Sequence, residues 1–343
     1  MSDELAKARS FANTVRYSGD KLRSKDSVKR GTDEINSFFS LNSMLINPLV
    51  TPSISKSIHN VVRRLQIPKK SVKAYVYASP DIQAECHAGD DVDCVIRLSS
   101  GLIDILDNRE IEFVIGHEIG HFIYSHGLAA ALNRNKSLEF SIQQRAQEIS
   151  ADRIGLLACN SLDHSIRAMM KTMSGLSSKY LNFNIGAFLS QLSNTEQFKS
   201  QIDINSTHPS ILIRCRALLW FSMSETFKSG KQNYQANEVK KLNSKIKRDI
   251  DKFIDSVARE KIEKLKHDVA LWLCASKIIE DNTFDNAEQK IFSDMFGEEL
   301  LGKLKNFLSS HNNASSVKKS VSDKLGLAIN SLQGEIPASF EEE

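Results

Sequence analysis

The stretch "EFVIGHEIGHFIYSH", residues 112–126, constrains this chain more than any other, because it places histidines and a glutamate inside an apolar run. Asp107 followed by Glu110 forms a capping box, which is typical of a helix start. Apolar residues then continue at helical spacing from Ile111 to Phe122. The sequence therefore predicts a buried helix that carries these polar side chains.

His117 and His121 are four residues apart, so at about 100° per residue they project from one helix face, one turn apart. Glu118 lies beside them, where it can reach a water on a shared ion without being a ligand, as in an HExxH zinc site. The alternative is a pair of neutral core histidines, but this would bury the Glu118 carboxylate unpaired, which is costly. We therefore expect His117 and His121 to bind zinc and Glu118 to act as the general base.

Catalytic zinc needs a third protein ligand and an open fourth position. The metzincin solution requires a glycine at position 124 and a histidine at 127, where this chain has Tyr124 and Gly127. On a continuing helix, His126 would lie about 140° round from His121 and point elsewhere. These observations exclude the metzincin class.

A glutamate on a second helix is the other common third ligand, and "QQRAQEISADRIGLLA" supplies one. Glu148 is the candidate ligand, and Asp152, one turn later on the same face, is the candidate acceptor for a histidine N–H. The alternative is an exposed acidic pair near Arg145 and Arg153. Coupled to the upstream histidines, the metal site is the better interpretation.

With these motifs the chain resembles the HtpX-like and CAAX prenyl protease zinc metallopeptidases, which are gluzincins. The family's HExxH is matched at residues 117–121, and its ExxAD by "EISAD" at 148–152. Its "GL" before the active helix is matched by "SSGLIDIL", and its distal HP…R pattern by "THPSILIR". The resemblance covers roughly residues 40–225 and implies a zinc metallopeptidase with one Zn²⁺ per chain.

The same resemblance implies that His208 or a neighbour lies near the site, with Arg214 close by. A histidine there could donate a hydrogen bond to the tetrahedral oxyanion. The alternative is a His-Pro that starts a helix, with Arg214 structural, because proline after a loop residue is ordinary helix-start chemistry. Both interpretations stay open.

A peptide substrate is expected to add a strand along the edge formed by Gln83, Ala84, Glu85 and Cys86. This mode favours extended or unfolded segments. The resembled family has "NAF" where this chain has "QAEC", so substrate preference is not carried over. The membrane helices of many family members are also missing.

Composition narrows the classes of partner and compartment. Lys and Arg total 45 against 42 Asp and Glu, and this net charge of +3 is too small to indicate nucleic acid. The five cysteines are an odd number without a CxxC pair, which favours neither a disulfide framework nor a cysteine zinc site. With no apolar leader and no apolar run of about 20 residues, we expect a cytoplasmic protein without transmembrane segments.

The chain is expected to be α+β: a mainly helical zincin domain with a small β-sheet, followed by an all-α domain. Residues 1–33 are predicted to form a basic arm with too few apolar positions for a core. The metallopeptidase domain is placed at 34–228 and the helical domain at 229–335, with a disordered tail at 336–343.

The segment from about 250 to 310 also resembles TerB-like helical domains in its acidic loop "EDNTFDNAE". The alternative is a helical interaction or regulatory domain that binds a protein partner, since its lysine face is what a solvated helix shows. Two functions therefore stand: a zinc endopeptidase acting on protein substrates, and a non-catalytic or latent zinc fold that binds a partner. Glu118 favours the first, since a purely structural metal site needs no general base.

Overall fold

The computed structural model describes residues 3–18, 20, 38–88, 94–126, 137–194, 209–228, 236–252, 256–280, 284–311, 313–337 and 339. The chain divides into two compact units. Unit 1 comprises residues 1–134 and 141–254, and unit 2 comprises residues 135–140 and 255–343. The functional domains proposed from the sequence stay predictions.

The sheet of unit 1 has the strand order β1, β2, β4, β3 over the described residues. The strands are β1 (Met44–Leu45), β2 (Val72–Tyr77), β3 (Ala84–Ala88) and β4 (Cys94–Ser99). β2 and β4 are parallel, whereas β1 pairs antiparallel with β2, and β3 with β4. β3 therefore lies at an edge. The sequence analysis missed β1, because two residues carry no alternating pattern.

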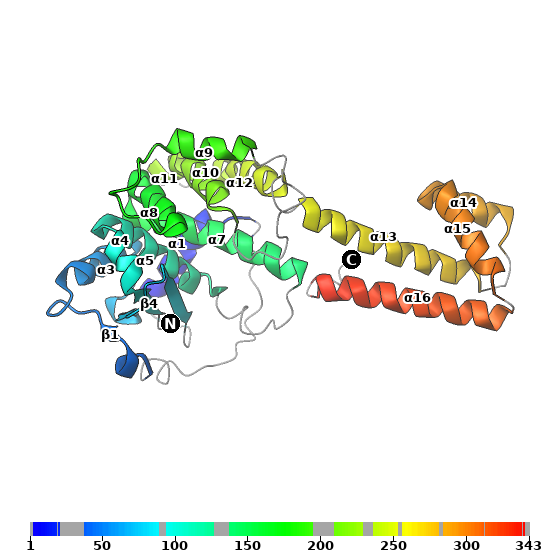
Figure 1. Ribbon diagram of the computed structural model, residues 1–343, viewed down its shortest axis with the longest axis horizontal. Coiled ribbons are helices and arrows are strands. Elements are labelled where there is room, and N and C mark those ends of the chain that lie inside the picture. The colour runs from blue at the N-terminus through cyan, green and yellow to red at the C-terminus, as the bar shows by residue number, and fades with distance from the viewer. Residues whose placement is uncertain are drawn as a thin grey trace. The chain divides into compact units, whose positions relative to one another are not determined.

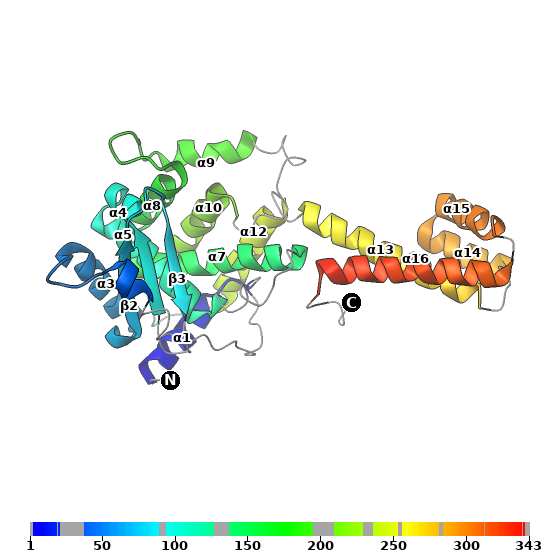
Figure 2. The same cartoon turned by 60° about the horizontal axis from the view of Figure 1, so that its bottom comes forward.

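The helices α4 and α5 pack against this sheet, and α3 and α8 lie nearby (Figures 1 and 2). The helices are α1 (Asp3–Val15), α3 (Pro52–Leu65), α4 (Ser100–Ile105), α5 (Asn108–Ile123), α7 (Leu138–Cys159), α8 (Leu162–Ser174), α9 (Ile185–Asn194), α10 (Ile211–Ser222), α11 (Glu225–Lys228) and α12 (Ala236–Ile250), with a 3₁₀ turn at Lys69–Ser71. α5 packs against β3 and β4 on one side, and against α3 and α8 on others. The predicted α+β, mainly helical class is confirmed.

The first turn of α5 is fixed by the predicted capping box. The Asp107 carboxylate accepts hydrogen bonds from the backbone N–H groups of Arg109 and Glu110, and Glu110 accepts one from the Asp107 N–H at 2.8 Å. The same Glu110 oxygen lies 2.6 Å from the ammonium of Lys171 on α8, and both side chains are buried. An ion pair thus ties the start of α5 to α8.

Helix α1 differs from the sequence expectation of an arm with too few apolar positions for a core. Its residues Leu5, Ala8, Ala12 and Val15 are buried in the core of unit 1. They recur every three or four residues and so form one stripe, but two of them are alanines, which contribute little to an apolar count. The part of the predicted arm at 21–33 lies outside the described residues.

Unit 2 is helical throughout its described residues, as predicted. Its helices are α13 (Ser256–Ile278), α14 (Asn286–Phe296), α15 (Glu298–Ser309) and α16 (Ala314–Glu335), and residues 138–140 at the start of α7 also belong to it. α13 and α16 lie side by side (Figure 1), and Phe292, Leu301 and Val321 are buried in the unit's core. Ile336, the first residue of the predicted tail, is buried. No helix in the described ranges is long and apolar enough to span a membrane.

Candidate metal centre

Helices α5 and α7 approach each other so closely that only small residues fit between them. A Cβ on Gly116 would lie 2.3 Å from the Cβ of Ala158, and one on Gly120 would lie 2.9 Å from the Cα of Ala151. These pairings run in opposite directions along the chain, so the two helices are antiparallel. Side chains that flank the glycines of α5 therefore reach those of α7.

This contact brings together the three predicted metal ligands. His117 Nε2 lies 3.5 Å from one oxygen of Glu148, and His121 Nε2 lies 3.4 Å from the other. The two Nε2 atoms are 3.0 Å apart. One donor atom from each residue thus falls within 4.8 Å of the others, a spacing that a single metal ion can bridge.

Asp152 holds His117 from the opposite side of its ring. His117 Nδ1 lies 3.0 Å from Asp152 Oδ1, and since an ionised carboxylate only accepts, the ring donates from Nδ1. The other ring nitrogen, Nε2, faces Glu148 and is the one that could bind a metal ion. Asp152 therefore occupies the place expected for it beside a ligand histidine.

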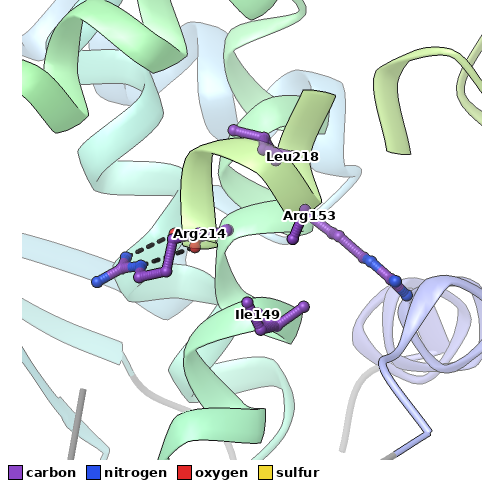
Figure 3. Close-up of a pocket in the computed structure, with 6 residues that line it drawn as sticks. Ile149, Arg153, Arg214 and Leu218 are labelled. Carbon is purple, nitrogen blue, oxygen red and sulfur yellow. Dashed lines mark hydrogen bonds and ion pairs between the residues drawn. The ribbon is translucent and has the colours of Figure 1, made fainter. Parts of the chain in front are cut away.

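Arg214 of α10 in turn holds Asp152 by two hydrogen bonds, of 2.8 Å from Nε and 2.6 Å from Nη2 (dashed lines in Figure 3). Its Nη1 also lies 2.9 Å from an oxygen of Glu148. Burial raises the pKa of Asp152, but the charge and hydrogen bonds of Arg214 outweigh it and lower the pKa below its usual value. Asp152 thus stays ionised.

The acidic pair on α7 is buried, not exposed as in the alternative interpretation. Glu148 is 4% exposed and Asp152 2% exposed. Arg153, which follows Asp152, points away from Arg214 toward α1 (Figure 3), where its Nη1 donates to the Val15 carbonyl at 2.7 Å. Arg214, not Arg153, is therefore the cation that neutralises both carboxylates.

Glu118 is 7% exposed and lies on α5 between the two histidines in sequence. Among the described residues none donates a hydrogen bond to its carboxylate. Burial lowers the pKa of His121, but the hydrogen bond and charge of Glu148, together with the charge of Glu118, outweigh burial and raise it. The pKa of the Cys86 thiol is raised by its contact with Cys94 and by burial, and the charge of Glu118 adds to this. Glu118 therefore lies near both the histidines and β3, and its carboxylate oxygens can accept further hydrogen bonds.

The predicted substrate edge corresponds to β3 and the residue before it. Gln83 accepts a hydrogen bond from the Tyr77 hydroxyl at 3.3 Å, and Glu85 accepts one from Arg97 of β4 at 2.5 Å. Cys86 Sγ lies 3.4 Å from Cys94 Sγ, and this contact and burial raise the pKa of Cys86. Ala84 begins the strand. These side chains contact β4 and β2, and among the described residues no strand pairs with the other edge of β3.

His126 does not point away from the site, contrary to the prediction. Its Nδ1 lies 2.8 Å from His121 Nδ1, because α5 ends at Ile123 and Ser125 adopts a left-handed conformation with φ of 57°. The helical extrapolation to 140° therefore does not apply. Burial lowers the pKa of His126 to about 4, so its ring is neutral at pH 7.

Two more residues near the site were missed, Arg16 and Asp20, which lie in the segment predicted to be a basic arm without a core. Asp20 Oδ2 lies 3.1 Å from His126 Nε2 and 2.9 Å from Arg16 Nε. Burial raises the pKa of Asp20, but these hydrogen bonds lower it to about 2. Asp20 is one of several acidic residues scattered among basic ones in this part of the chain, so it gave no sequence signal. His208, the predicted oxyanion donor, lies outside the described residues.

Comparison of the sequence with known proteins identifies the family of this chain. A sequence model of peptidase family M48 matches residues 48–142 and 132–220, which together span half of the chain. The chain belongs to peptidase family M48. The M48 match contains α5, α7 and the part of α10 that carries Arg214. The predicted resemblance to a metallopeptidase family is therefore confirmed as membership of peptidase family M48.

Two curated relatives of this M48 chain are metalloproteases of Escherichia coli (strain K12). Metalloprotease YcaL is 44% identical over 54 residues, which are 16% of this chain and 20% of YcaL. Metalloprotease LoiP is 40% identical over 63 residues, 18% of this chain and 23% of LoiP. The chain thus matches only about a fifth of the length of each relative. No solved structure matches it.

Proposed function

We propose that this M48 chain is a zinc-dependent endopeptidase that cleaves extended or unfolded protein segments. The observation that carries the proposal is the convergence of His117, His121 and Glu148 within 4.8 Å, with Glu118 beside them. Two imidazoles and one carboxylate are a ligand set of catalytic zinc sites, which keep a fourth position open. We assign one Zn²⁺ per chain to these three residues.

The surroundings of the three side chains fit a zinc ion. Asp152 fixes the ring of His117 with its Nε2 lone pair toward Glu148, and such carboxylate partners orient metal-binding histidines. Arg214 contacts Glu148 through Nη1 and so holds that carboxylate in place. When bound, zinc would polarise the scissile carbonyl and lower the pKa of a water to about 7.

Glu118 is the proposed general base. A carboxylate that is nearly buried and accepts no hydrogen bond within the described part of the chain is free to accept a proton from the attacking water. It then passes this proton to the leaving amine. His208 stays the candidate donor to the oxyanion, and Arg214 positions Glu148 and Asp152 without touching the substrate.

The substrate would bind along β3. The edge of β3 that no described strand covers offers N–H and C=O groups to an extended peptide, which adds as a further strand. Because α5 packs against β3, a peptide there passes close to Glu118. Helical or folded segments cannot pair in this way, so unfolded casein should be cleaved faster than the same mass of a folded protein.

The proposal is tested by incubating the full chain with fluorescent casein before and after removal of metal by a chelator. We expect cleavage that is lost with the metal and restored by one equivalent of Zn²⁺. Zinc binding without cleavage would favour the non-catalytic, partner-binding alternative. The partner-binding role of the C-terminal helices, the lack of a nucleic-acid partner and the cytoplasmic location stay predictions.

Replacing Asp152 with asparagine should weaken zinc binding by about 10- to 100-fold, as is usual for residues that orient a ligand histidine. The amide can still meet His117 but leaves Arg214 without its bidentate carboxylate. The dissociation constant is measured by competition with a chromophoric chelator. An unchanged constant in the folded variant would make Asp152 a residue of the fold alone.

A further inference from the structure

His121 is held from behind by another histidine, whereas His117 contacts a carboxylate directly. His121 Nδ1 lies 2.8 Å from His126 Nδ1, and His126 Nε2 lies 3.1 Å from Oδ2 of Asp20. Ionised Asp20 can only accept, so His126 donates to it from Nε2. With its proton on Nε2, His126 accepts at Nδ1, so His121 donates from its own Nδ1. The neutral form of His121 then has its lone pair on Nε2, facing Glu148.

The carboxylate at the end of this series is itself fixed. Arg16 donates to both oxygens of Asp20, from Nε and Nη2 at 2.9 Å each. Gln143 of α7 donates its side-chain N–H to Oδ1 of Asp20 at 3.2 Å. Asp20 is 4% exposed, so these contacts are shielded from water. The Asp20 carboxylate, which accepts the hydrogen bond of His126, is therefore held in place and paired with the Arg16 guanidinium.

The ring of His126 is fixed by Tyr124. The two rings are stacked with centroids 5.3 Å apart and an angle of 25° between their planes. The Tyr124 hydroxyl donates to the carbonyl of Ala12 in α1 at 2.7 Å, and the Arg16 guanidinium carbon lies 5.1 Å from the Tyr124 ring centroid. The end of α1 and the residues after it thus determine how His126 meets His121.

Each of the two histidines of α5 is thus oriented by a buried carboxylate that is itself paired with an arginine. The two carboxylates come from different parts of the chain. Arg214 and Asp152 support His117, and Arg16 and Asp20 support His121 through His126. We propose that Asp20 and His126 are positioning residues that fix the tautomer and orientation of His121, so that the segment after α1 completes the metal centre. This inference rests on the zinc site proposed above.

A purely structural role for the same contacts is the competing explanation, because they also attach α1 to the rest of unit 1. The two explanations differ in what a substitution changes. Loss of packing lowers the stability of the metal-free protein and leaves the zinc affinity of the folded protein unaltered. Loss of positioning lowers zinc affinity, because the His121 ring can then rotate or carry its proton on Nε2.

The test compares His126→Leu with His126→Gln in the full chain. Glutamine can donate its amide N–H to Asp20 and accept from His121 through its amide oxygen, whereas leucine can do neither. We expect His126→Leu to raise the zinc dissociation constant by about 10- to 100-fold and His126→Gln by less than about 10-fold. The matched control, Asp163→Asn on the surface of α8, should leave the constant unchanged.

A second readout is the visible absorption spectrum of the Co²⁺-substituted protein, which reports the geometry of the ligands directly. It should shift in His126→Leu and resemble wild type in His126→Gln. Equal zinc affinity and equal spectra in both variants would overturn the positioning role alone, whereas a wild type without zinc would overturn the proposed function as well. If His126→Leu does not fold, Asp20→Asn takes its place, and unchanged zinc affinity in that variant overturns the inference.

Discussion

Replacing Glu118 with glutamine is expected to leave zinc bound and to lower kcat by about 10²- to 10⁴-fold, the usual contribution of a general base. Glutamine has the shape of glutamate but cannot take a proton from the attacking water. Glu118 is not one of the three residues whose donor atoms converge, so the metal should remain. The measurement is kcat on fluorescent casein together with the zinc content of each preparation.

The control for this variant is Glu225→Gln, an exposed glutamate on α11 that pairs with Lys228. It removes the same charge far from α5 in the sequence and should leave both kcat and zinc content at the wild-type level. Wild-type turnover in Glu118→Gln would refute the assignment of the base. Loss of zinc from that variant would instead make Glu118 a ligand, contrary to the site described here.

Replacing Lys171 with methionine should destabilise the protein by about 3 to 5 kcal/mol, because it leaves a buried charge on Glu110 without a partner. Lys171 is 1% exposed and Glu110 fully buried, and the distance between their charged groups is 2.6 Å. The free energy of unfolding is measured by urea denaturation of the metal-free chain. Since the pair ties α5 to α8, the loss should appear in the unfolding of unit 1.

Two further variants isolate the cause of this loss. The double variant Glu110→Gln/Lys171→Met removes both charges, and glutamine can still accept the capping hydrogen bond from Asp107, so most of the stability should return. Lys228→Met breaks an exposed pair and should cost less than about 1 kcal/mol. If the double variant is as unstable as Lys171→Met, packing and not the unpaired charge accounts for the loss.

The sequence was sufficient to predict the parts of the fold that depend on local patterns. The capping box at Asp107 predicted the start of α5, and the four-residue separation of His117 and His121 predicted that they share one helix face. Glu148 and Asp152 could be proposed as partners because they repeat the same spacing on a second helix. These features depend on neighbours within about four residues, which periodicity reports directly.

The parts that could not be predicted depend on where helices end and how closely they pack. His126 contacts His121 only because Ser125 leaves the helical conformation. No pattern of residues in the sequence predicts that turn. Asp20 reaches His126 from more than 100 positions away in the chain. The approach of α5 to α7 depends on Gly116 and Gly120, because a side chain at either position would collide with α7. This requirement becomes apparent only once the position of the opposing helix is known.

The central claim, a metal site made by His117, His121 and Glu148, is tested most directly by counting zinc in the purified full chain. Elemental analysis after gel filtration in metal-free buffer should give about one Zn²⁺ per wild-type chain and almost none for His121→Ala, as expected for a three-ligand site that loses one ligand. Wild-type protein that holds no zinc and does not take it up when supplied, or His121→Ala that holds as much as wild type, would contradict the account.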